Sequence, residues 1–306
     1  MKRLFVVGGI AAILFASSAM AADLPVYKAP PPPVAVPTWT GFYVGGNIGY
    51  SWGDAQTDFT ASGSTVTSHA VFPGTFPTNF YLADSNNAGL SGVVGGGQIG
   101  YNFQFSPRWL VGVEADIQGS GERGSNTFVD QFSTPLCVAS NAAGNCLAFL
   151  PLNGTAVTSY DAKINWFGTV RGRVGVLLTD QTLVYGTGGL AYGGVELSGQ
   201  TYLSGGYVIS GRAFPFFPAS AAFNSSATNL GFAVGGGIES KFSFWLPARW
   251  TWKVEYLYVD LGSLNAATSY STTFNSSLRA TPITGPITTH ASFTDNIVRV
   301  GLNYGF

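Results

Sequence analysis

Residues 92–118 read GVVGGGQIGYNFQFSPRWLVGVEADIQ and carry the pattern that decides the fold. Two stretches of predicted β-strand, 92–105 and 109–118, are joined by only Ser106, Pro107 and Arg108. Serine and proline favour turns, and a connection this short joins neighbouring antiparallel strands. The stretch is therefore predicted to be a β-hairpin.

The first strand of the chain, GFYVGGNIGYSW at 41–52, alternates with a period of two. Phe42, Val44 and Ile48 share one face, whereas Tyr43 and Gly45 share the other. An apolar face opposite a small or polar face is typical of a barrel strand with lipid outside, although a strand of a soluble sandwich would alternate in the same way. Similar segments predict eight strands: 41–52, 92–105, 109–118, 164–178, 183–197, 230–244, 250–262 and 291–306.

The lengths of the connections separate these two architectures. Short turns at 106–108, 179–182 and 245–249 alternate with long connections rich in Ser, Thr, Asn, Gly and Ala, at 53–89, 120–159, 199–227 and 263–290. Such alternation is the pattern of outer-membrane barrels, with short periplasmic turns and long extracellular loops. We predict an all-β fold, an eight-stranded antiparallel transmembrane β-barrel. The sequence leaves open whether the long connections continue the strands as hairpins.

The N-terminal residues predict export. Lys2 and Arg3 precede an apolar stretch, 4–15, and then Ala19-Met20-Ala21, the order of a secretory signal peptide cleaved after Ala21. Residues 22–38 contain Pro30 to Pro33 and Pro37, and we expect them to form a periplasmic linker. The barrel is expected at 39–306, in the outer membrane. The apolar stretch is too short for a spanning helix, which needs about 20 residues.

Charge is scarce, and its placement predicts the interior of the barrel. Only 9% of residues are charged, against about 25% in typical domains, and no basic cluster points to a nucleic acid. Nine charged side chains lie on the strand faces opposite to lipid. This is expected, because a charged side chain in contact with lipid is costly. They are Glu114, Asp116, Arg171, Arg173, Glu239, Lys241, Lys253, Glu255 and Arg299.

An eight-stranded barrel has an interior just wide enough for side chains to fill. Four acids and five bases in that space are expected to pair, because an unpaired buried charge is costly. The sequence therefore predicts a salt-bridged plug across the lumen. The alternative interpretation of the same residues is a narrow pore that passes ions or small solutes.

The other residues with reactive side chains point to structure more than to catalysis. Cys137 and Cys146 lie in a polar stretch of an exported chain and predict a local disulfide, with two free thiols as the alternative. No catalytic motif occurs, so we expect neither an enzyme nor a bound cofactor. The two histidines, His69 and His290, fall in loops next to neighbouring strands and form a weak candidate site for haemin or a metal; two solvated histidines are the simpler interpretation.

The strands resemble a known family. The segments ADLPVYKAPPPP, WTGFYVGGNIGYSWG, FGTVRGRVG, GTGGLAYG and VRVGLNYGF look like the small outer-membrane barrels of alphaproteobacteria, called immunogenic outer-membrane or porin-family proteins. The resemblance covers nearly the whole mature chain but not the long loops. The final strand, with Tyr304 and Phe306, resembles the assembly signal that such barrels present to the insertion machinery.

This resemblance implies an eight-stranded, surface-exposed barrel with a structural role in the envelope and, in some relatives, haemin binding. We expect outer-membrane lipid to be its partner. Three functions remain open at this stage. The first is a non-catalytic envelope protein that supports the membrane and presents its loops. The second is a small porin, and the third is a receptor for haemin or another surface ligand.

Overall fold

The computed structural model describes residues 38–68, 75–141, 143, 145–216, 218–242, 249–273, 279–280 and 282–306. The predicted signal peptide, all but the last residue of the predicted linker, and His69 lie outside these residues. The contacts within the chain separate residues 1–37 from a unit that starts at Thr38, and only this second unit is described. Within it, no helix has the length and hydropathy of a membrane span.

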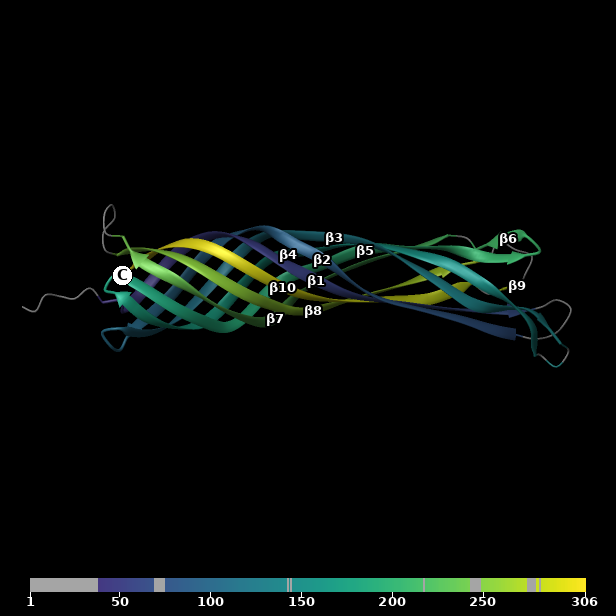
Figure 1. Cartoon of the computed structure of the whole chain (residues 1–306), viewed down its shortest axis with the longest axis horizontal. Helices are drawn as coiled ribbons and strands as arrows, with labels where there is room; N and C mark the ends of the chain where they lie inside the picture. Colours follow the sequence, from purple (N-terminus) through teal and green to yellow (C-terminus); the bar gives the residue numbers. More distant parts are fainter. Residues whose placement is uncertain are drawn as a thin grey trace, which may run out of the picture. The chain divides into compact units, whose positions relative to one another are not determined.

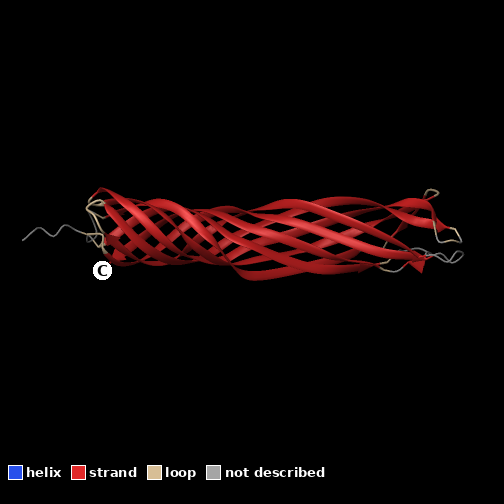
Figure 2. Ribbon diagram, turned by 90° about the horizontal axis from the view of Figure 1, so that it is seen from below, coloured by secondary structure: helices blue, strands red, loops and turns tan. Residues whose placement is uncertain are grey.

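Eight long antiparallel strands of the described chain form a closed ring (Figures 1 and 2). Two short strands extend it, since β6 pairs with β5 and β9 pairs with β1. The ring runs β1-β2-β3-β4-β5-β7-β8-β10 and closes where β10 pairs with β1. This confirms the predicted eight-stranded barrel. The strands are β1 (Gly41–Ser68), β2 (Thr75–Gln104), β3 (Trp109–Ser140), β4 (Cys146–Thr179), β5 (Thr182–Ile209), β6 (Arg212–Pro215), β7 (Ala219–Lys241), β8 (Trp250–Thr272), β9 (Arg279–Ala280) and β10 (Ile283–Gly305).

The long strands reach far beyond the segments that the sequence predicted. Strands β1 and β2, for example, pair from Gly41 opposite Asn102 to Ser68 opposite Thr75, so most of the expected loop 53–89 is a hairpin. The other long connections also continue the strands. The period of two persists in these segments, but many positions carry Ser, Thr, Ala or Gly, and the alternation is therefore weak in the sequence.

The half of the barrel that carries the short turns has the predicted lipid-facing surface. Phe42, Val44, Ile48, Tyr50 and Trp52 of β1 are all exposed. Phe42 and Trp52 are ten residues apart, which matches the roughly 9–11 residues that a tilted strand needs to cross a bilayer. Aromatic side chains at the far edge of this surface form what we call the outer girdle: Trp52, Trp166, Tyr192 and Tyr258.

Beyond the outer girdle the ring opens into two sheets. Among the described residues, the β2–β3 ladder ends at Ser91 opposite Arg123, and the β7–β8 ladder ends at Phe232 opposite Asp260. The strands then group as β8-β10-β1-β2 and β3-β4-β5-β7. We call this part of the molecule the distal sandwich.

Irregularities in four strands mark the transition from barrel to sandwich. The register shifts between Gly119 and Glu122 on β3, between Ile164 and Trp166 on β4, and between Ser292 and Thr294 on β10. On β8, Gly262 has φ 69°, a conformation that glycine adopts without steric cost. Bulges bend strands and increase their twist, and here they turn the strands away from the closed ring.

The distal sandwich has an apolar core. Phe59, Phe80, Phe128, Phe132 and Phe293 are among its buried side chains. The rings of Phe80 and Phe132 stack with their centroids 4.5 Å apart. Burial of aromatic and aliphatic side chains between two sheets is the main stabilising contribution in a sandwich. The interior of the described molecule therefore holds a charged cluster and a small apolar cluster within the ring, and a mainly apolar core beyond it.

Candidate functional site: the charged lumen

The period of two along each strand places the charged side chains inside the ring. Eight of the nine predicted residues form one buried cluster, which we call the lumen plug, and Lys241 lies apart from it at the turn end. Inward-facing glycines leave room for these long side chains. A Cβ at Gly49 would lie 2.7 Å from Cβ of Arg299, and one at Gly189 would lie 2.7 Å from Cα of Arg171. The members of the plug are Glu114, Asp116, Arg171, Arg173, Glu239, Lys253, Glu255 and Arg299.

Arg171 on β4 is the centre of the lumen plug. Its guanidinium lies 2.6 Å from Glu114, 3.1 Å from Asp116 and 3.1 Å from Glu255. These carboxylates come from β3 and β8, so the contacts reach across the lumen and not only to neighbouring strands. Only 1% of the surface of Arg171 is exposed.

Three further bases complete the ion pairs. Lys253 lies 2.9 Å from Glu114, and Arg173 lies 3.0 Å from Glu239. Arg299 on β10 lies 2.8 Å from Asp116 and 2.6 Å from Glu255. Four acids thus face four bases, and the plug carries no net charge. Such balance lets the charges be buried, because each ion keeps a partner in the low-dielectric interior.

Neutral side chains that the sequence analysis missed hold the plug in place. The hydroxyl of Tyr43 donates to Glu114 at 2.7 Å, and that of Tyr185 donates to Glu255 at 3.0 Å. The guanidinium of Arg173 lies 5.0 and 4.9 Å from the centres of the same two rings. Both tyrosines lie on the inward faces of their strands, as the charged residues do. The alternation of the sequence could therefore have placed them in the lumen.

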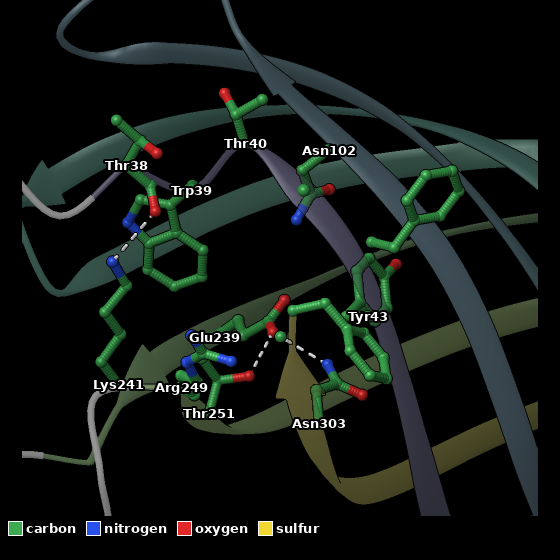
Figure 3. A pocket seen from close by; sticks show the side chains of 14 residues that line it. Thr38, Trp39, Thr40, Tyr43, Asn102, Glu239, Lys241, Arg249, Thr251 and Asn303 are labelled. Carbon is green, nitrogen blue, oxygen red and sulfur yellow. Dashed lines mark hydrogen bonds between the residues drawn. The ribbon is translucent and has the colours of Figure 1, made fainter.

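The turn end of the lumen is covered by the residues that precede β1. Trp39 is buried, its indole N–H donates to the carbonyl of Asp180, and its backbone N–H donates to Gln104. Lys241 lies at this end, where its ammonium is 4.8 Å from the centre of the Trp39 ring (Figure 3). A cavity of about 120 Å³ lies beneath these residues and has Glu239 and Tyr43 among its walls.

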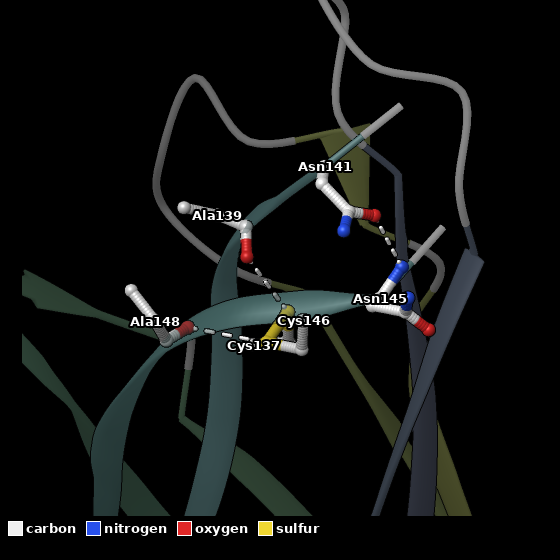
Figure 4. The surroundings of a disulfide bond; sticks show 6 residues. All are labelled: Cys137, Ala139, Asn141, Asn145, Cys146 and Ala148. Atoms are coloured by element: carbon white, nitrogen blue, oxygen red, sulfur yellow. Dashed lines mark hydrogen bonds between the residues drawn. A yellow bond between two sulfur atoms is a disulfide. The ribbon is translucent and has the colours of Figure 1, made fainter. Parts of the chain in front are cut away.

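Cys137 and Cys146 form a disulfide near the turn between β3 and β4 (Figure 4). Within that turn, the side chain of Asn141 accepts a hydrogen bond from the backbone N–H of Asn145. At the opposite end, the ring of Tyr304 lies 5.3 Å from that of the exposed Phe306. The backbone N–H of Phe306 bonds the carbonyl of Phe42, which ties the chain end to the first strand.

The histidine pair is not tested, because His69 lies outside the described residues. His290 is half-buried on β10, opposite Asp58 of β1, and its Nδ1 lies 2.7 Å from Oδ1 of Asn265. The described residues contain no group of three or more His, Cys, Asp or Glu side chains that could hold a metal.

A second pair of buried acids, absent from the predictions, lies just beyond the outer girdle. Asp295 is opposite Gly53, one position past Trp52, and Glu122 lies near it at the bulge of β3. Both are almost fully buried. Burial and the neighbouring charge of Glu122 raise the pKa of Asp295 to about 9, and burial raises the pKa of Glu122. At neutral pH the pair is therefore expected to hold a proton.

Comparison with known proteins identifies the family of this barrel. The model of the outer membrane protein beta-barrel domain matches residues 9–306. The chain belongs to this family. It is 33% identical over 301 residues to the 31 kDa outer-membrane immunogenic protein of Brucella melitensis, with 96% of each chain covered. It is also 27% identical over 228 residues to the 22 kDa outer membrane protein of Rhizobium leguminosarum, with 74% of this chain and 66% of that one covered.

The predicted family and outer-membrane location are thereby confirmed, and the protein is an outer-membrane β-barrel. Among solved structures, the attachment invasion locus protein Ail of Yersinia pestis aligns with 81% of this chain and 98% of its own, at 12% identity. The TM-score of this alignment is 0.27, which is too low to support any structural or functional argument.

Proposed function

We propose that this protein is a closed, non-catalytic outer-membrane barrel that supports the envelope and presents the distal sandwich outside the cell. The short turns, Thr38 and Phe306 would face the periplasm. The observation that supports this best is the lumen plug, in which four acids and four bases pair across the ring.

Two barriers in series support the absence of a pore. An ion that crossed the ring would have to displace Arg171 from three carboxylates, all of them buried. It would next meet the apolar core of the distal sandwich, where Phe59 and Phe293 are at most 1% exposed. Moving an ion into such surroundings is costly, because nothing there replaces its hydration.

The two other functions left open by the sequence receive less support. A porin needs a continuous wet path, and each of the four bases of the plug is instead paired with a buried carboxylate. The structure does not test the proposed haemin site, because the described residues include His290 and not His69. We further propose, from the position of Phe306 at the end of β10, that the last strand is what the insertion machinery recognises.

Single-channel recording of the full-length protein in a planar bilayer tests the proposed function. Folded wild-type protein is expected to give no steps above the baseline. Arg171→Ala, which breaks the plug but leaves the apolar core, is also expected to stay silent. Stable wild-type steps that change in size or ion preference in Arg171→Gln would establish a pore and overturn the proposal.

A further inference from the structure

The far end of the distal sandwich exposes apolar side chains on two neighbouring hairpins. On β4, Leu147 and Phe149 are 67% and 60% exposed, and on β5 Val208 and Ile209 also face solvent. Strands β4 and β5 pair up to Asn153 opposite Gly206, and these four residues lie just beyond that point on the two strands. We call the four residues, together with Arg212, the tip patch.

The hairpin of β5 and β6 is shaped to protrude. Ser210 and Gly211 have φ of 48° and 79°, so the chain reverses in two residues between Ile209 and Arg212. The guanidinium of Arg212 lies 5.5 Å from the centre of the Phe214 ring and is exposed. Strand β6 lies at the end of the molecule opposite the C-terminus (Figure 1). A protruding hairpin with apolar side chains beside a cation is suited to insert into a soft surface such as a lipid bilayer.

Charge is distributed unevenly along the distal sandwich. The four outer segments, 59–83, 131–160, 197–229 and 261–289, contain no Asp or Glu, and their only basic residues besides His69 are Arg212 and Arg279. Acids gather nearer the ring, including Asp54, Asp58, Asp84 and Asp130. A tip that only needed to be soluble would carry charges of both signs and no apolar cluster. This tip instead carries basic residues and exposed apolar side chains.

We propose that the tip patch docks onto a lipid bilayer that contains anionic lipids, with the hairpin tips entering its head-group region. This inference rests on the proposed surface-presenting function and names its partner. Membrane surfaces bind exposed apolar side chains in proportion to the area buried, and anionic head groups attract a neighbouring arginine. The four apolar side chains of the patch carry no polar atoms, and the guanidinium of Arg212 can donate hydrogen bonds to a head-group phosphate.

Vesicle binding by the protein in a nanodisc tests the proposal. The nanodisc already covers the lipid-facing surface of the barrel, so only the two ends are free to bind. Co-flotation is measured with vesicles of phosphatidylcholine alone and of phosphatidylcholine mixed with phosphatidylserine. Wild-type protein is expected to float with both kinds of vesicle and to bind the anionic one more tightly.

Matched variants separate the tip from the rest of the sandwich. Val208→Ser/Ile209→Ser and Leu147→Ser/Phe149→Ser are each expected to weaken binding by at least about tenfold. Arg212→Gln is expected to lose about fivefold on anionic vesicles only. The control, Val129→Ser/Tyr202→Ser, removes two exposed apolar side chains farther from the tip and is expected to bind normally.

Three results would overturn the proposal. The first is the absence of wild-type flotation with either vesicle, and the second is an equal loss in the control variant. The third is the formation of dimers, or the binding of another protein, that depends on the tip patch while vesicles do not bind. Either result would show that the patch binds a protein and not a membrane. None of these results bears on conductance, so a failure here is distinguishable from a failure of the proposed closed barrel.

Discussion

Arg171 shows how a single buried residue affects the stability of the barrel. Its guanidinium contacts three carboxylates, and all three also contact Arg299. Breaking a buried ion pair leaves an unpaired charge in a medium that solvates it poorly. The stability of the ring therefore depends on complete pairing more than on any single ion pair.

We expect Arg171→Met to lower the free energy of unfolding by about 3–5 kcal/mol, because it removes one of the two cations that three buried carboxylates share. Urea unfolding in lipid or detergent measures the change. Arg108→Met, in an exposed turn, is the control and should change stability by less than about 0.5 kcal/mol. Equal effects of the two substitutions would contradict the assigned pairing.

The Glu122–Asp295 pair predicts a pH dependence. The pKa of Asp295 is about 9 in the folded protein, whereas an unfolded aspartate titrates near about 3.9. Between these values the folded state retains a proton that the unfolded state has lost, so stability falls as the pH rises from about 4 to 9. Asp295→Asn should flatten this dependence, as followed by urea unfolding at several pH values. An unchanged slope in the variant would refute the buried pair.

At the scale of the elements, each long strand belongs to two structures. In the membrane ring the inward residues include the charges of the plug, glycines and neutral polar side chains, and in the distal sandwich most of them are apolar. The bulges of β3, β4 and β10 and the glycine conformation of β8 lie between the two environments. Because bulges interrupt the ladder, they separate the stability of the sandwich from that of the ring.

We expect Phe132→Ala to destabilise the distal sandwich by about 3–5 kcal/mol, because it leaves a cavity where the ring stacks on Phe80. Amide hydrogen exchange should show lost protection in the outer parts of β2, β3 and β4 only. Val129→Ala, exposed on the same strand, serves as the control. Loss of protection within the ring as well would show that the two parts unfold together.

At the scale of the whole molecule, two interiors of opposite character are stacked along one set of strands. The plug is held by ion pairs within the ring, and the sandwich is held by an apolar cluster that includes none of the plug's residues. The ring therefore has its own source of stability, and the sandwich sets how far the tip stands from the membrane.

Replacing residues 59–83, 131–160, 197–229 and 261–289 with short turns is expected to leave a folded ring. The plug, the lipid-facing surface and the contact between Phe306 and Phe42 all lie outside these segments. Folding can be followed by the shift in electrophoretic mobility between unheated and heated samples. A truncated chain that never shows the folded band would mean that the ring needs the sandwich.

The sequence alone determined the barrel, its eight strands and the inward position of the charges. This was possible because lipid on one face imposes a strict alternation, as in Phe42, Val44 and Ile48 against Tyr43. Only the tertiary structure decided which ions pair, because Arg171 and Glu255 are brought together by closure of the ring across 84 positions of sequence. It also decided that the long connections form a sandwich and that Lys241 contacts Trp39. Serine- and threonine-rich strands show little alternation, and only packing against the opposite sheet reveals which of their faces is buried.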